Sequence, residues 1–201
     1  MDLLLATSRQ RLSCGVLIVN AERELLLCHV TGQHHWDLPK GGMTAGESPL
    51  DTALRETEEE TGLVLDSAAL TDLGRFDYRR RKALHLFATL MPRLDVGTLR
   101  CASHFSDAAS GRRLPEMDGF AWFGFADAPR HTGTRMAAVI GGLIELDRLL
   151  ARLMLAPPHA QRRDNGLPST GARSGPGAEP VACPRRPPLI RPTRPRASSR
   201  T

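Results

Sequence analysis

The stretch Trp36–Leu63 constrains the fold of this chain more than any other part of its sequence. It reads WDLPKGGMTAGESPLDTALRETEEETGL, so a glycine-rich turn with a lysine directly precedes an acidic segment. Ser48 is a favourable helix N-cap, because its hydroxyl can accept a hydrogen bond from a free backbone N–H of the first turn. Pro49 suits the first helical position, and Gly62 can adopt the left-handed conformation that often ends a helix. The stretch therefore predicts a helix from Pro49 to Thr61.

Three glutamates of this helix share one face. Glu56, Glu59 and Glu60 stand at positions i, i+3 and i+4, and side chains at this spacing repel each other by about 0.2–0.5 kcal/mol per pair on an isolated helix. A hard cation such as Mg²⁺ removes that repulsion, because it takes oxygen ligands. Arg55 lies one turn before Glu59 and could orient its carboxylate. For these glutamates alone, a solvated acidic helix face is the alternative.

The loop before the helix has the composition of an anion-binding turn. It reads Pro39-Lys40-Gly41-Gly42 and follows a short apolar strand at Trp36. Glycine lets the backbone approach a ligand closely, and the Lys40 ammonium adds a positive charge for phosphate. Together the loop and the acidic helix predict a site for a divalent cation and a phosphate chain.

The spacing of these residues resembles the Nudix box, G-x5-E-x7-R-E-U-x-E-E-x-G-U, in which U is a bulky aliphatic residue. The one departure is Thr57 at the first U position. The resemblance covers about residues 11–155 and implies an α/β Nudix fold, in which a mixed β-sheet lies between α-helices in an α/β/α sandwich. The residues that match the pattern are Gly41, Glu47, Arg55, Glu56, Glu59, Glu60, Gly62 and Leu63.

The resemblance also implies a metal-dependent pyrophosphohydrolase that cleaves a nucleoside diphosphate linked to another group. The three helix glutamates and the Gly41 carbonyl would hold Mg²⁺ or Mn²⁺. Enzymes of this family often carry a further catalytic glutamate in a variable loop. Glu116 is the leading candidate here, because it precedes the expected strand Gly119–Phe125, although it could also be an ordinary surface acid. Either Glu59 or Glu116 would take the proton of the attacking water.

Within the family, the motif W-x-L-P-K-G followed by A-L-R-E-T-x-E-E-T-G is most similar to hydrolases of dinucleoside polyphosphates such as diadenosine tetraphosphate. The substrate would then be a small nucleotide or polyphosphate. Two alternatives remain open, which are a sanitising hydrolase of oxidised nucleoside triphosphates and a non-catalytic Nudix-like nucleotide sensor. Substrate choice depends on variable loops, so the motif alone does not decide among them.

A basic turn is the second candidate for substrate contact. The segments 71–78 and 83–91 predict a β-hairpin, and its tip reads Arg79-Arg80-Arg81-Lys82. Arg79, Arg81 and Lys82 could bind the phosphates of a long polyphosphate together with Lys40. Tyr78, directly before the tip, could stack on a base. A solvated hairpin tip is the alternative.

Simple patterns outline the rest of the domain. Two β-rich runs, 13–20 and 24–31, predict a hairpin. Residues 93–118 are polar and predict irregular structure. Apolar residues recur at helical spacing in 134–155 and predict a C-terminal helix, although Gly141-Gly142 weakens that prediction.

The composition changes completely from residue 157. Residues 157–201 hold ten of the fifteen prolines and nine arginines against Asp164 and Glu179, a balance of +7. We therefore expect a disordered tail after a domain of residues 11–155. Because the whole chain carries +5, the remainder carries −2, which argues against nucleic-acid binding by the domain.

No targeting signal is apparent in the sequence, so we expect a cytoplasmic protein. The first residues lack the basic region and long apolar core of a secretory signal. No apolar run approaches the roughly 20 residues that a membrane span requires. The four cysteines show neither paired nor metal-type spacing, so we expect free thiols in a reducing compartment. The oligomeric state is left open.

Overall fold

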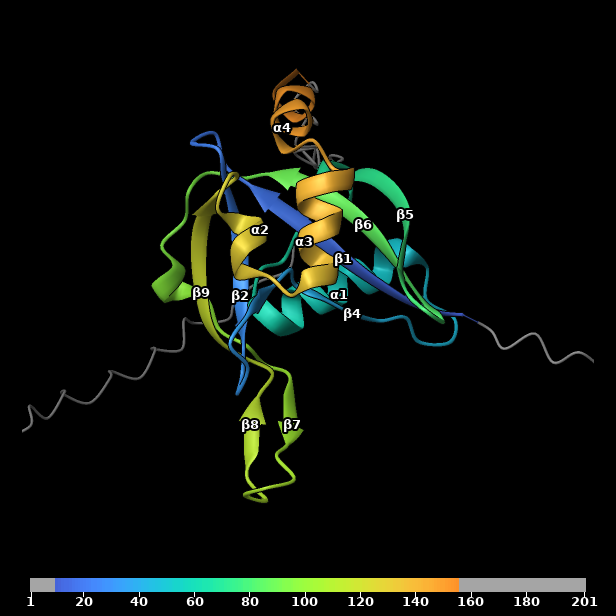
Figure 1. Cartoon of the computed structure of the whole chain (residues 1–201), viewed down its shortest axis with the longest axis vertical. Helices are drawn as coiled ribbons and strands as arrows, with labels where there is room; N and C mark the ends of the chain where they lie inside the picture. Colours follow the sequence, from blue (N-terminus) through green and yellow to red (C-terminus); the bar gives the residue numbers. More distant parts are fainter. Residues whose placement is uncertain (1–9, 156–201) are drawn as a thin grey trace, which may run out of the picture. The chain divides into compact units, whose positions relative to one another are not determined.

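A seven-stranded mixed sheet forms the centre of the fold in the computed structural model, which describes residues 10–155 (Figure 1). Five strands follow the order β3-β2-β1-β6-β5, while β4 pairs with β1 and β9 pairs with β2. The predicted disordered tail 157–201 lies outside the described residues. The strands are β1 (Arg11–Val19), β2 (Glu24–Val30), β3 (Trp36–Asp37), β4 (Lys40–Gly42), β5 (Thr71–Arg79), β6 (Lys82–Leu90) and β9 (Met117–Gly124).

Both predicted hairpins are confirmed, and a strand of the first hairpin, β1, pairs in parallel with a strand of the second, β6. β1 runs antiparallel to β2, and β5 runs antiparallel to β6. β1 and β6 are parallel from Arg11↔Lys82 to Val19↔Leu90. A strand that is covered on both faces is apolar throughout and does not alternate. This placement explains why residues 13–20 are all buried.

Helix α1 (Pro49–Thr61) covers one face of the sheet and has the predicted bounds. The Ser48 side chain accepts from the backbone N–H of Asp51, whose carboxylate in turn accepts from the Ser48 backbone N–H. This reciprocal pair is a capping box. At the other end, Gly62 has φ 76° and its N–H donates to the Glu58 carbonyl at 2.8 Å. Beneath α1 lies a core that includes Cys14, Val16, Ile18, Leu26, Ala53, Phe87 and Leu99.

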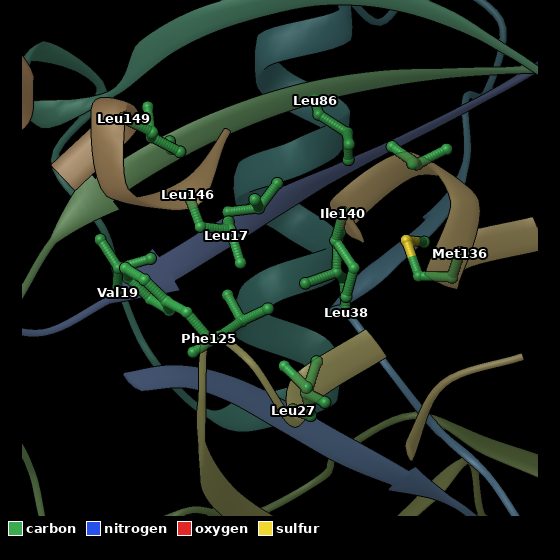
Figure 2. Close-up of a cluster of buried hydrophobic side chains, with 14 of the residues drawn as sticks. Leu17, Val19, Leu27, Leu38, Leu86, Phe125, Met136, Ile140, Leu146 and Leu149 are labelled. Carbon is green, nitrogen blue, oxygen red and sulfur yellow. The ribbon is translucent and has the colours of Figure 1, made fainter. Parts of the chain in front are cut away.

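The opposite face of the sheet carries the larger core, which Figure 2 shows in close-up. Leu17 and Val19 of β1 and Leu86 of β6 meet residues of the C-terminal helices there. In Figure 1 the sheet therefore lies between α1 and α3, as expected for an α/β/α arrangement. The C-terminal elements are α2 (Ala128–His131), α3 (Thr134–Ala138), a π-helical turn (Val139–Leu143) and α4 (Leu146–Leu155).

The prediction of one continuous helix over 134–155 is wrong. The backbone widens into the π-helical turn and becomes extended at Ile144 before α4 begins. Gly141 packs against α2 so closely that a Cβ there would lie 3.1 Å from Pro129 Cγ. The two glycines also have a low helix propensity. The helix is therefore interrupted where Gly141 packs against α2, and α3 and α4 each still bury their apolar side.

Residues 93–118, expected to be irregular, contain some regular structure. Strands β7 (His104–Ser106) and β8 (Arg113–Pro115) form a small hairpin that extends from the body of the fold (Figure 1). The same segment contains a short 3₁₀ turn at Val96–Thr98, and another 3₁₀ turn, Ser67–Ala69, lies between α1 and β5. The β7–β8 hairpin returns the chain to the sheet at β9.

Two findings concern the targeting expectations. Within residues 10–155, none of the helices combines the length and the apolar character that crossing a membrane requires. Cys14, Cys28 and Cys101 are free thiols, as expected, and Cys183 lies outside the described residues.

Candidate active site

Helix α1 buries two of its three candidate carboxylates. Glu56 and Glu60 are 8% and 2% exposed and lie on the side of the helix that faces the sheet. The Glu59 side chain is 44% exposed. Glu58, on the outer side of the helix, is exposed. The spacing i, i+3, i+4 therefore produces an acidic edge of α1, along which Glu56 and Glu60 are buried and Glu59 is partly exposed.

Arg55 holds this edge together. Its Nη1 donates to Glu56 Oε1 at 2.8 Å and to Glu59 Oε2 at 3.0 Å. Its Nε and Nη2 donate to the two carboxylate oxygens of Glu47 at 2.6 and 3.1 Å, and Nη2 also reaches the Gly42 carbonyl at 3.2 Å. These hydrogen bonds hold the pKa of Glu47 well below its usual range. One guanidinium thus orients three carboxylates and the preceding loop.

The backbone of β4 forms the wall opposite the helix. The Lys40 N–H donates to Glu60 Oε2 at 2.8 Å. Gly41 lies against the other buried carboxylate, since a Cβ on Gly41 would fall 2.0 Å from Glu56 Oε2. No side chain larger than glycine fits here without moving that carboxylate. The predicted loop therefore meets the predicted helix through its main chain.

The buried carboxylates have raised pKa values. Burial raises the pKa of Glu60 to about 8; Lys40 opposes this rise, while the charges of Glu56 and Glu116 add to it. Burial also raises the pKa of Glu56, and Arg55 offsets part of that rise. Desolvation disfavours the charged form of an acid. The fold therefore buries two acids whose negative charge the protein alone compensates poorly.

A series of backbone hydrogen bonds holds Glu116 near the C-terminal end of α1. The backbone N–H groups of Ala102 and Ser103 donate to the Glu59 carbonyl at 2.7 and 3.2 Å, which ties this segment to the end of α1. The Glu116 N–H then donates to the Ser103 carbonyl at 3.1 Å, and the Glu116 carbonyl accepts from the Thr31 N–H at 3.0 Å. Glu116 is half-buried, and its charge raises the pKa of both buried glutamates. The structure thus brings the loop glutamate and the helix glutamates together.

The basic hairpin tip lies at the N-terminal end of β1, where the Arg11 N–H donates to the Arg81 carbonyl at 2.9 Å. Arg79 and Arg81 are exposed, and Arg81 has the unusual φ of 99°. Together with Arg135 of α3 they line a cavity of about 330 Å³. Burial lowers the pKa of Lys82, and the charges of Lys40 and Arg79 lower it further. The tip is therefore a region of excess positive charge.

Tyr78 and Lys40 differ from what the sequence led us to expect. Tyr78 is 6% exposed and belongs to the larger core, which does not fit stacking on a base. The Lys40 Nζ lies 2.7 Å from Asp37 Oδ2, and the two side chains are 14% and 11% exposed. Burial lowers the pKa of Lys40, but Asp37 and Glu60 more than reverse this and raise it. The ammonium is therefore already paired inside the protein.

Asp37 is a residue that the sequence analysis did not identify. The signal available in the sequence was weak: an acid between the apolar residues Trp36 and Leu38, directly before the glycine turn. Buried acids are rare unless they are paired, so its position in a short buried strand pointed to a partner nearby. The structure identifies that partner as Lys40.

The donor set fits a hard divalent cation. One oxygen of each helix glutamate is anchored by Arg55 or by the Lys40 N–H, and the second oxygen receives no hydrogen bond from any residue within 10–155. Carboxylate and carbonyl oxygens are the ligands that Mg²⁺ and Mn²⁺ prefer. Among the same residues, no three acidic, histidine or cysteine side chains are close enough to hold an ion as they stand. Binding would therefore draw the unbonded oxygens of Glu56, Glu59 and Glu60 together.

The buried Glu60 predicts how the stability of the metal-free protein depends on pH. Between pH 4.5 and 8 the folded protein keeps a proton on Glu60 that the unfolded chain has released. Stability falls as pH rises wherever the folded state binds more protons, here by at most about 5 kcal/mol. Glu60→Gln carries no charge and should remove most of this fall, which urea unfolding in EDTA at pH 5 and pH 8 measures.

The matched control for this measurement is Glu58→Gln, on the exposed side of the same helix. It should keep the pH dependence of the wild type. The same loss of stability between pH 5 and pH 8 in Glu60→Gln and Glu58→Gln would contradict the prediction.

Comparison with known proteins gives the following matches. The family profile described as the NUDIX domain matches residues 9–140. The asymmetrical bis(5′-nucleosyl)-tetraphosphatase of Mus musculus is 32% identical over 126 residues, which are 58% of this chain and 80% of that protein. An RNA pyrophosphohydrolase of Marinomonas sp. (strain MWYL1) is 27% identical over 123 residues, which are 57% of this chain and 76% of that protein.

Two solved structures share the fold. A C. elegans Ap4A hydrolase in a binary complex superposes with a TM-score of 0.52 at 21% identity, covering 70% of this chain and 98% of that one. The NUDIX domain of Shewanella oneidensis NrtR complexed with ADP ribose gives 0.51 at 19% identity, covering 71% and 88%. At these identities the likeness shows the architecture alone.

Proposed function

This chain is a hydrolase of the NUDIX family, and from that premise we propose that it is a metal-dependent pyrophosphohydrolase that cleaves a nucleoside diphosphate linked to another group. One observation carries the proposal. Four carboxylates, three from α1 and Glu116 from the loop, gather beside the backbone of Lys40 and Gly41. Two of them are buried with raised pKa values. A bound cation, which a polyphosphate would bring with it, would compensate the negative charge of this cluster better than the protein does alone.

Each residue has a role in this proposal. Glu56, Glu59, Glu60 and the Gly41 carbonyl would hold the divalent ion. When bound, Mg²⁺ or Mn²⁺ neutralises the pyrophosphate and makes water a stronger acid. Arg55 holds the carboxylates of Glu56 and Glu59 next to each other by donating a hydrogen bond to each.

The remaining roles concern the proton and the phosphates. Glu59 or Glu116 accepts the proton of the attacking water. Attack at phosphorus breaks the phosphoanhydride bond, and the leaving oxygen departs with its phosphate. Arg79, Arg81 and Lys82 lie in a region of excess positive charge, which suits the outer phosphates of a long substrate.

For the substrate we propose a dinucleoside polyphosphate such as diadenosine tetraphosphate. The relative from Mus musculus is named a bis(5′-nucleosyl)-tetraphosphatase, and its similarity extends over 126 residues. The hairpin tip adds three exposed arginines at the N-terminal end of β1. A substrate with four phosphates carries more negative charge than a nucleotide sugar, which suits this basic tip.

A panel of substrates with Mg²⁺ tests the proposal. We expect diadenosine tetraphosphate to be hydrolysed to ATP and AMP, at a kcat/KM about tenfold or more above that for nucleotide sugars, oxidised nucleoside triphosphates and 5′-triphosphorylated RNA. Chromatography of the products measures this. Preferential hydrolysis of oxidised triphosphates would support a sanitising enzyme instead. Nucleotide binding without turnover of any substrate would support a sensor and refute the enzymatic proposal.

A further inference from the structure

Asp37 is a buried carboxylate of β3 that the proposed mechanism does not use. Both of its oxygens are engaged. Oδ1 accepts from the Leu38 N–H at 2.9 Å, and Oδ2 lies 2.7 Å from Lys40 Nζ. An enclosed ion pair of this kind must be complete, because either partner alone would leave an uncompensated charge in the interior.

The ammonium of this pair lies on the side of the sheet that faces away from α1. In the β1–β4 ladder Gly41 lies opposite Cys14, which belongs to the core beneath α1. Side chains alternate along a strand, so the Lys40 side chain leaves on the other face. Gly15, opposite Lys40, provides the room, since a Cβ there would lie 2.4 Å from Lys40 Cβ.

The backbone of the same segment contacts the catalytic carboxylates. The Lys40 N–H donates to Glu60 at 2.8 Å, and Gly41 lies against the Glu56 carboxylate. The preceding Pro39 carbonyl accepts from the Val16 N–H of the central strand at 3.2 Å. One short segment thus connects an ion pair on one face of the sheet to two acids on the other.

We propose that Asp37 is a positioning residue, which acts through the Lys40 ammonium to hold the Lys40–Gly41 backbone against Glu60 and Glu56. In this assignment the ammonium of Lys40 binds Asp37 and does not bind phosphates of the substrate. The inference rests on the proposed function for its kinetic consequences. Its consequences for folding and for metal binding rest on the ion pair and the backbone contacts alone.

Asp37→Asn tests the proposal, because asparagine can still accept from the Leu38 N–H but leaves the ammonium without a counter-charge. We expect the Tm of the metal-free protein to fall by about 5–15 °C. We expect the Mg²⁺ concentration that gives half of the thermal stabilisation to rise about 10–100-fold, and kcat to fall by about the same factor. KM for diadenosine tetraphosphate should change less than about threefold, because substrate contacts remain.

The double variant Asp37→Asn/Lys40→Met separates positioning from substrate binding. Methionine fills the space of the lysine stem without its charge, so Tm should recover most of the loss and kcat should rise about tenfold above that of Asp37→Asn. Asp127→Asn, which breaks the exposed ion pair with Arg130, is the matched control and should leave Tm, kcat and the Mg²⁺ midpoint as in the wild type.

Two results would overturn the proposal. The first is an Asp37→Asn protein with the Tm, Mg²⁺ midpoint and kcat of the wild type. The second is a Lys40→Met protein with unchanged Tm and a KM raised tenfold or more, whose defect persists in the double variant, since Lys40 would then contact the substrate. Tm and the Mg²⁺ midpoint require no turnover, so they decide the positioning role even where the substrate panel refutes the proposed enzyme.

Discussion

Replacing Glu59 with glutamine should lower kcat by about 10²–10⁴-fold, the range typical for loss of a general acid–base group. Glutamine keeps an oxygen that can accept from Arg55, so the geometry of the carboxylate edge should survive. The fold should survive as well, because the hydrogen bonds from Ala102 and Ser103 use the Glu59 backbone carbonyl. Release of AMP from diadenosine tetraphosphate at saturating Mg²⁺ measures kcat, and circular dichroism with thermal unfolding checks the fold.

The control for this experiment lies one residue away. Glu58→Gln removes a carboxylate of the same helix that is exposed to solvent, and it should retain the kcat and the Tm of the wild type. If Glu59→Gln kept the wild-type kcat, Glu59 would have no part in the reaction. Glu116, the loop candidate, would then be the base to test by Glu116→Gln.

Gly41→Ala should lower kcat by about 10²-fold, the loss that a misplacement of about 1 Å can cause in an active site. The added methyl would fall 2.0 Å from Glu56 Oε2 and 2.1 Å from its carboxyl carbon, far inside contact distance. Rotation of the Glu56 carboxylate can relieve that overlap, so the fold should persist and most of the cost should appear in activity. Steady-state kinetics and Tm, measured on the same preparation, separate the two effects.

Gly42→Ala provides the matched comparison. A Cβ at Gly42 meets no atom within 4 Å, and neither glycine has a positive φ. The carbonyl of residue 42 that accepts from Arg55 is kept. The substitution should therefore leave kcat within about twofold of the wild type, since surface substitutions away from special features have small effects. Equal losses for the two alanine variants would show that backbone flexibility, and not the contact with Glu56, is what the glycines provide.

The elements that could be predicted from the sequence are those with local causes. Helix α1 begins after Ser48 and ends before Gly62 because capping is decided within a few residues. The convergence of Glu56, Glu59 and Glu60 on one edge follows from helix periodicity in the same way. The resemblance to the Nudix box then supplied the architecture, which the structure confirms.

The features that could not be predicted depend on contacts between distant segments. The break at the π-helical turn arises where Gly141 meets Pro129 of another helix. Tyr78 was expected to be able to stack on a base, but packing in the larger core determines its position. Lys40 looked like a free cation beside a glycine turn, because the sequence does not show that its side chain leaves the sheet on the face opposite Gly41.

The two-stranded arm formed by β7 and β8 is joined to the body at fixed points on both sides. Ser103 is bonded to the end of α1, and Glu116 is bonded to Ser103 and to Thr31 of the neighbouring loop. The length and the side chains of residues 104–115 can therefore change while the backbone of Glu116, which follows them, stays in place. Insertions or substitutions within β7 and β8 should therefore leave the backbone of Glu116 in place beside α1.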